Sequence, residues 1–208
     1  DHLHISILED LRGSPSTSRP VSETHQASPE TGYAHDFFSF VRFATNLRSL
    51  RLGCIYALDM DVLDTSQLLN LCHLKLVGFK TSAAQLLAIV EQNKCSLQEI
   101  ILGGIQLKDG TWQEIFARLC QLPCLIDFQI LYGGYAADGS SSHLAASYSE
   151  TEEIQDIESN RVLDYYALGD LQRHVNGLRH AAGLSEMDEH EYGWADMAPV
   201  EEVLQQLS

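Results

Sequence analysis

Acidic and imidazole side chains gather in one short stretch near the end of the 208-residue chain. The segment GLSEMDEHEYGW, residues 183–194, contains five oxygen or nitrogen donors, namely Glu186, Asp188, Glu189, His190 and Glu191. Such donors could bind a hard metal ion, but the stretch lacks the central glycine and the terminal carboxylate of a calcium loop. The sequence therefore favours a solvated acidic tail over residues 185–208 rather than a metal site.

Cysteine spacing offers a second test for chemistry. The five cysteines, at positions 54, 72, 95, 120 and 124, are odd in number and form no CxxC pair. A structural zinc site would need more thiols or suitably spaced histidines. We expect reduced and at least partly buried cysteines, which is typical of a cytoplasmic or nuclear protein.

Motifs of known catalytic chemistry are missing from the sequence. It contains no GxSxG, no GxGxxG, no phosphate-binding Gly-Lys-Ser loop and no HExxH. We therefore predict that the protein is not an enzyme and that it has no catalytic, cofactor-binding or metal-binding residues. The alternative, a hydrolase or metal-dependent enzyme, would need several catalytic side chains that converge in one polar cleft.

Charge and hydropathy limit the partners that the chain could bind. The formal net charge is −16, and residues 149–208 alone contribute −11. A surface this acidic repels phosphate backbones, so nucleic acid is an unfavourable partner. No apolar run approaches the ~18 residues of a membrane span, which argues against a membrane protein. With 45% hydrophobic residues, the chain can still form a substantial core.

A repeated pattern underlies the middle of the chain. Four segments, NLRSLRL, NLCHLKL, SLQEIIL and CLIDFQI, place apolar residues at the first, fourth and sixth positions, counted from Leu47, Leu71, Leu97 and Leu125. These first positions are 24, 26 and 28 residues apart, and such a period is typical of repeat proteins. We predict strands near 48–52, 73–77, 98–102 and 127–131. Helices are expected near 59–69, 82–93 and 111–122.

The third of these helices carries the clearest local signals. Thr111 and Glu114 have the spacing of a capping box at the helix start, and Pro123 ends the helix. An apolar face follows at helical spacing, formed by Trp112, Ile115, Phe116, Leu119 and Leu122. We expect this face to pack behind the third and fourth strands.

The L-x-x-L-x-L segments resemble leucine-rich repeats of the longer, helix-containing class. That resemblance implies an α/β solenoid, with parallel strands on a concave face and helices on the convex face, over residues 35–135. LHISI at 3–7 is also strand-like, so residues 1–12 could be the remnant of an earlier repeat. Residues 13–34 would then be a flexible insertion, because 11 of the 18 residues from 14 to 31 are Ser, Thr or Pro.

A narrower resemblance follows from DGTWQEIFARLCQLPCLIDFQI and the acidic, Arg- and His-containing segment after it. Together these look like the C-terminal region of fungal F-box-type leucine-rich repeat proteins. In that family the repeats bind a substrate and an F-box recruits a ubiquitin ligase. The resemblance implies a substrate-recognition role, although the sequence contains no F-box pattern.

After a linker at 136–148, residues 149–184 are predicted to form a C-terminal helical segment. Ser149 and Glu152 could form its capping box, and Gly183 is a plausible end. Its apolar stripe contains Ile154, Ile157, Leu168, Leu171, Val175 and Leu178. This stripe predicts a helical cap on the last repeat, while a coiled-coil partner helix would produce a similar pattern.

Alternation along the strands predicts which side chains form a binding surface. The core should contain Leu50, Leu52, Leu74, Leu76, Ile100, Leu102, Phe128 and Ile130. Residues between them face the other way and form two rows, Ser49, His73, Glu99 and Asp127, and Arg51, Lys75, Ile101 and Gln129. We predict that these eight residues bind a protein partner. The alternatives are an ordinary solvated sheet face and a structural or degenerate repeat fragment with no partner.

Overall fold

The computed structural model describes residues 2–7, 38–39, 41–43, 46–136 and 157–187. Its strands are β1 His2–Ile7, β2 Ser49–Asp59, β3 His73–Ser82, β4 Glu99–Gly103, β5 Gln106–Asp109, β6 Asp127–Leu131 and β7 Gly134–Tyr135. Its α-helices are α2 Ala83–Gln92, α3 Trp112–Leu119 and α4 Val162–Ala181. Short 3-10 helices lie at η1 Val41–Phe43, η2 Met60–Val62 and η3 Thr65–Gln67.

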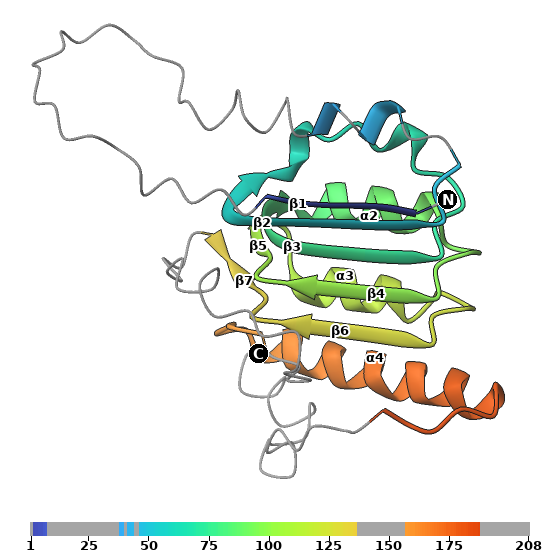
Figure 1. Ribbon diagram of the computed structural model, residues 1–208. Coiled ribbons are helices and arrows are strands. Elements are labelled where there is room, and N and C mark those ends of the chain that lie inside the picture. The colour runs from blue at the N-terminus through green and yellow to red at the C-terminus, as the bar shows by residue number, and fades with distance from the viewer. Residues whose placement is uncertain (1, 8–37, 40, 44–45, 137–156, 188–208) are drawn as a thin grey trace, which may run out of the picture.

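A parallel sheet organises the described residues. The main path runs β1-β2-β3-β4-β6, and β5 pairs with both β3 and β7 at one end of the sheet. Each of these strand pairs is parallel. Helices α2 and α3 cover one face of the sheet, and α4 lies beyond β6 against α3 (Figure 1). The predicted α/β class and the four predicted strands are confirmed.

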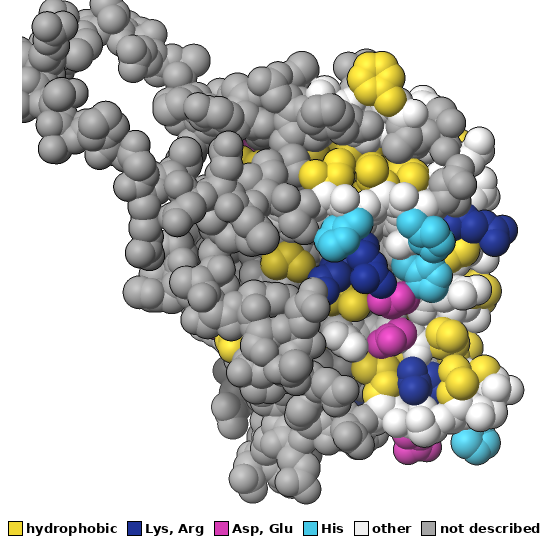
Figure 2. All heavy atoms as spheres, viewed as in Figure 1, with side chains coloured by type: hydrophobic (Ala, Val, Ile, Leu, Met, Phe, Trp, Pro, Cys, Tyr) yellow, Lys and Arg dark blue, Asp and Glu magenta, His cyan; other side chains and the backbone are white. Residues whose placement is uncertain are grey.

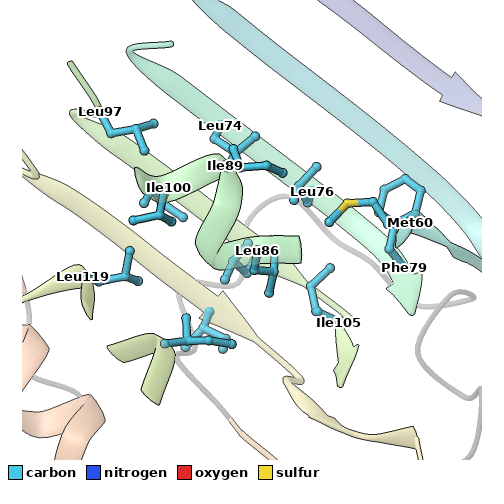
Figure 3. Packing of buried hydrophobic residues seen from close by; sticks show 14 of the residues in the cluster. Met60, Leu74, Leu76, Phe79, Leu86, Ile89, Leu97, Ile100, Ile105 and Leu119 are labelled. Atoms are coloured by element: carbon cyan, nitrogen blue, oxygen red, sulfur yellow. The ribbon is translucent and has the colours of Figure 1, made fainter. Parts of the chain in front are cut away.

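The core lies between this sheet and its helices. Leu50, Leu74, Ile100 and Phe128 are partners along one row of the sheet, and Leu52, Leu76, Leu102 and Ile130 along another. All eight predicted core residues are buried. Figure 3 shows Leu74, Leu76 and Ile100 of the sheet beside Leu86 and Ile89 of α2. Burying one such side chain contributes about 1.5–3 kcal/mol, so these rows supply much of the folding free energy.

Helix α3 begins and packs as its sequence predicts. The Glu114 amide donates to Thr111 Oγ1 at 3.1 Å, and the Thr111 amide donates to Glu114 Oε2 at 3.2 Å. Phe116 stacks on Trp112, with ring centroids 5.5 Å apart, and meets Phe128 of β6 edge-on at 6.0 Å. The capping box therefore positions an aromatic cluster directly behind the fourth predicted strand.

The predicted helix at 59–69 is wrong, because this segment forms the two short helices η2 and η3. The Asp59 and Asp64 carboxylates accept hydrogen bonds from the backbone amides of Asp61 and Ser66, both at 3.0 Å. Such local acceptors compete with the helical hydrogen-bond pattern. Leu63 and Asp64 between the two turns have extended backbone, which interrupts any continuous helix.

The prediction of helix from residue 149 is corrected in its described part. Residues 157–161 are not helical, since Ile157 forms a parallel bridge with Gly133 and the Glu158 amide donates to the Gly133 carbonyl at 2.6 Å. Helix α4 starts only at Val162. Ser149, Glu152 and Ile154 lie outside the described residues.

The packing and the end of α4 agree with the sequence prediction, unlike its start. Leu168, Leu171 and Val175 are buried, and α4 packs mainly against α3. Gly183 follows with a φ of +72°, and the amides of residues 183 and 184 donate to the carbonyls of residues 180 and 179. This pair of bonds is the Schellman arrangement that ends many helices at glycine.

Further sequence expectations have mixed outcomes. The predicted strand at 3–7 is confirmed, because β1 pairs with β2 in parallel. Residues 13–34, 137–148 and 188–208, which contain the predicted insertion, most of the linker and most of the tail, lie outside the described residues. Among the described residues, none of the five cysteines forms a disulfide, and only Cys95 is exposed. No described helix is both long and apolar enough to cross a membrane.

Candidate functional site

The sheet face opposite α2 and α3 carries the predicted binding residues. We call it the open face and define it by the side chains of His2, His4, Ser49, Arg51, His73, Lys75, Glu99, Ile101, Asp127 and Gln129. Strand register places His2, Ser49, His73, Glu99 and Asp127 in one row, and His4, Arg51, Lys75, Ile101 and Gln129 in the next. The structure thus brings together all eight residues predicted from the sequence.

These residues differ in how much surface they offer. Arg51 is exposed, whereas His73, Lys75, Glu99, Ile101, Asp127 and Gln129 are half-buried. Ser49 is only 4% exposed, and it lies between two larger side chains in its row, His2 and His73. A partner on the open face would therefore meet little of the Ser49 hydroxyl.

One hydrogen bond joins the middle strands of the open face. His73 Nδ1 lies 2.8 Å from Glu99 Oε2, and the two side chains are 39% and 24% exposed. Cross-strand pairs of this kind contribute about 0.2–1 kcal/mol. The contact holds both side chains in place and links the two halves of the face.

Charge divides this surface along the strand order. Basic and imidazole side chains lie on β1 to β3, and the acidic residues Glu99 and Asp127 lie on β4 and β6. Figure 2 shows histidine, lysine and arginine side chains gathered on this side of the molecule, with acidic side chains beside them. The face can therefore distinguish partners by the order of their charges.

Two residues of the open face escaped the sequence analysis. His2 and His4 belong to β1, and both are exposed at the basic end of the two rows. The alternating pattern of HLHISI, residues 2–7, would have placed them on this face. Its register with β2 could not be read from the sequence, because more than 40 residues separate Ile7 from Ser49.

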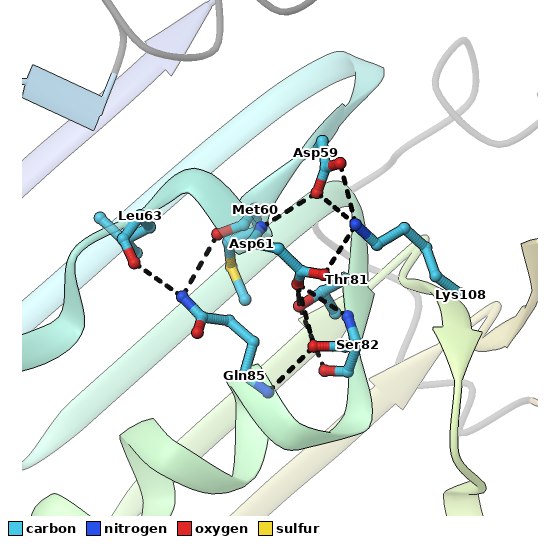
Figure 4. A network of polar contacts seen from close by, with 8 residues as sticks. All are labelled: Asp59, Met60, Asp61, Leu63, Thr81, Ser82, Gln85 and Lys108. Carbon is cyan, nitrogen blue, oxygen red and sulfur yellow. Dashed lines mark hydrogen bonds and ion pairs between the residues drawn. The ribbon is translucent and has the colours of Figure 1, made fainter.

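A polar network fastens the turn after β2 to α2 and β5 (Figure 4). Lys108 Nζ lies 2.8 Å from Asp59 Oδ1 and 2.7 Å from Asp61 Oδ2. Asp61 also accepts hydrogen bonds from Thr81 Oγ1 at 3.0 Å and from the Ser82 amide at 2.8 Å. Gln85 of α2 donates to the Leu63 carbonyl at 2.7 Å.

Electrostatics keep this network charged. Burial opposes ionisation of Asp61, but hydrogen bonds from Lys108, Ser82 and Thr81 outweigh it and lower the pKa of the carboxyl below its ordinary value. Burial likewise opposes charge on Lys108, yet Asp59 and Asp61 raise the pKa of its ammonium group. A lysine held protonated by two carboxylates is a poor nucleophile or base, so the network is structural.

A second network joins α4 to the end of the sheet. Asp164 is 1% exposed and accepts hydrogen bonds from the Tyr135 hydroxyl and Ser159 Oγ, both at 2.6 Å, and from the Gln113 amide at 2.9 Å. Burial and the bond to Asp164 raise the pKa of Tyr135 to about 12, and Arg161 lies 4.5 Å from its ring centroid. These contacts anchor the first turn of α4 at the start of α3.

Metal chemistry finds no support in the described residues. Within them, no three His, Cys, Asp or Glu side chains are arranged to hold a metal ion. Glu186 of the sequence-selected acidic stretch is exposed, while residues 188–191 of that stretch lie outside the described ranges.

Comparisons with known proteins leave the open face as the main guide to function. The fold places charged and polar side chains in aligned rows on the side of the sheet away from its helices. No protein-family model matches this chain, and neither the curated proteins nor the solved structures yield a match.

Proposed function

We propose that the protein is an interaction module, built from stacked strand–helix units of the leucine-rich repeat type, whose open face binds a protein partner. One observation carries the proposal, namely the in-register alignment of side chains from five strands on the side of the sheet opposite α2 and α3. Rigid neighbouring strands present such side chains in a fixed geometry, which suits recognition of a surface.

Backbone contacts support the repeat part of this proposal. Three carbonyls at related positions each accept two consecutive amides of the next unit. The Arg48 carbonyl accepts the backbone amides of residues 72 and 73, the Cys72 carbonyl those of 98 and 99, and the Gln98 carbonyl those of 126 and 127. These acceptors lie 24 and 26 residues apart, which matches the spacing of the apolar motifs. The same turn is therefore used again from unit to unit.

The form of the open face supports the binding part. Its residues combine charge with one apolar side chain, Ile101, between the basic and acidic halves. Charge complementarity at an interface guides encounter and fixes register. In the described residues we find no converging catalytic group that would favour the hydrolase alternative over binding.

Substrate recognition for a ubiquitin ligase is a narrower form of the same role. The resemblance of residues 109–130 and the following acidic segment to fungal F-box-type proteins supports it. A cytoplasmic or nuclear location is also part of the proposal, and the lack of a disulfide among the described cysteines supports it. Co-purification of ligase subunits with the chain would test the ligase role. Imaging of a tagged chain in cells would test the location.

The binding role can be tested by capture of partners from the native cell extract with the full chain. Arg51→Glu with Lys75→Glu reverses two charges on the open face and should remove the specific partner. Lys94→Glu with Arg173→Glu changes the net charge equally, and both residues are exposed away from that face. Loss of the partner with the control pair alone would place binding elsewhere and contradict the proposal.

A further inference from the structure

Arg51 is the centre of a basic row on an otherwise acidic chain. The protein has 13 Lys and Arg residues against 29 Asp and Glu. Arg51 is exposed, and no described residue forms an ion pair with it. Its partners in strand register are His4 on one side and Lys75 on the other. Three nitrogen-bearing side chains therefore stand side by side.

Strand geometry makes this row compact. Neighbouring strands are about 4.8 Å apart, so the three residues span roughly 10 Å across the sheet. Charges farther away than about 8 Å are largely screened at physiological salt. A docked segment therefore interacts more strongly with this row than with charges on distant parts of the chain.

Among the residues that the structure describes, neither acidic residue of the open face pairs with Arg51. Glu99 is hydrogen-bonded to His73 at 2.8 Å in the adjacent row. Asp127 lies on β6, three strands from Arg51 in the sheet order. In its own row Arg51 is followed by Lys75 and then by Ile101, which is half-buried and apolar.

We propose, on the basis of the function proposed above, that the open face binds an extended acidic segment of a partner protein. In this proposal a carboxylate of the partner segment binds between Arg51 and Lys75, and an apolar side chain of the same segment packs on Ile101. The midpoint of the two basic residues is about 7 Å from Ile101 at normal strand spacing. This distance matches side chains two residues apart in an extended chain, so the recognised pattern is acidic-x-apolar.

A direct test uses a short fluorescein-labelled peptide with the pattern acidic-x-apolar. It contains several glutamates, and the last of them lies two positions before a leucine. Fluorescence anisotropy with the full chain should show binding that weakens as salt is raised. Arg51→Glu with Lys75→Glu should weaken binding on the order of tenfold, since two attractive contacts become repulsive. The control pair, Lys94→Glu with Arg173→Glu, should change the affinity for the peptide less than about twofold.

Two results of the peptide experiment would overturn the inference. One is equal binding by the double-reversed open-face variant, and the other is equal binding of a peptide with lysines in place of the glutamates. A further arm replaces Asp188, Glu189 and Glu191 by their amides in the full chain. If that change tightens peptide binding about tenfold, the occupant is the chain's own tail and the assignment to a partner is wrong.

Partner capture with one further open-face variant, Ile101→Glu, separates this inference from the broader binding role. If the acidic peptide fails to bind but Ile101→Glu still removes a captured partner, the chemistry of the segment is wrong while the open face remains the binding surface. If no open-face variant affects capture, the proposed function itself fails.

Discussion

The Tyr135 hydroxyl donates a 2.6 Å hydrogen bond to Asp164, and this bond ties the short strand β7 to the first turn of α4. The Tyr135 oxygen also accepts the Trp112 amide at 3.1 Å, so sheet, α3 and α4 meet at one buried point. A carboxylate that is 1% exposed is stable only while its hydrogen bonds are made.

Removal of this buried carboxylate should destabilise the fold. Asp164→Ala leaves the donors of Tyr135, Ser159 and Gln113 without their acceptor, which we expect to cost about 2–4 kcal/mol of unfolding free energy. Urea unfolding measures the loss, with the exposed Asp170→Ala as the control at less than about 0.5 kcal/mol. Equal stability of the two variants would show that the network does not hold α4.

Two glycines should respond in opposite directions to alanine. Gly78 has a φ of +76°, and a Cβ there would clash with the backbone carbonyl of Cys54 in β2. Gly78→Ala should therefore cost more than about 2 kcal/mol. Gly177 lies in α4 with open space around it, so Gly177→Ala should stabilise by about 0.5–1 kcal/mol through helix propensity. Thermal unfolding distinguishes the two, and equal melting temperatures would contradict the register of β2 and β3.

Core truncations test the packing of sheet against helices. Leu76→Ala and Phe116→Ala remove buried side chains from β3 and α3, and each should cost about 2–5 kcal/mol. Leu69→Ala is the matched control, because Leu69 is 51% exposed. Chemical denaturation with a loss below about 1 kcal/mol for the buried pair would be inconsistent with their placement.

The network around Asp61 should make stability depend on acid. Because its pKa is lowered from 3.8 in the folded protein, the carboxylate stabilises the fold above about pH 4. That contribution is lost as pH falls through the folded pKa. Asp61→Asn should therefore be less stable than the native chain by about 1 kcal/mol at neutral pH, since the site is partly exposed. The difference should shrink in acid, and a constant difference from pH 7 to pH 3 would rule out this linkage.

Local patterns allowed much of the fold to be predicted. The apolar spacing placed Leu50, Leu74, Ile100 and Phe128 in one buried row, and the same alternation placed Arg51 and Lys75 side by side. Thr111 and Glu114 marked a helix start because both partners lie within one turn. Short-range geometry fixes these features, so a single sequence contains them.

Contacts between residues far apart in the chain could not be predicted from the sequence. Asp164 looked like an ordinary acidic residue of an amphipathic helix, and only the fold brings Tyr135 to it. Asn93 gave no signal either, yet its side chain accepts the Leu71 amide and donates to the Leu68 and Ile89 carbonyls at 2.7–2.8 Å. The sequence also contained no sign that Asp61, in the segment expected to be a helix at 59–69, has Ser82 and Lys108 as partners.

The central claim is that the open face binds the partner, and footprinting of the complex tests it most directly. Hydroxyl-radical labelling of the full chain, with and without a captured partner, reports which side chains lose solvent access. The account predicts protection of His4, His73 and Ile101 on the open face, with unchanged labelling of the exposed Leu184 after α4. Protection confined to the outer surfaces of α2, α3 and α4, with His73 and Ile101 still fully labelled, would contradict it.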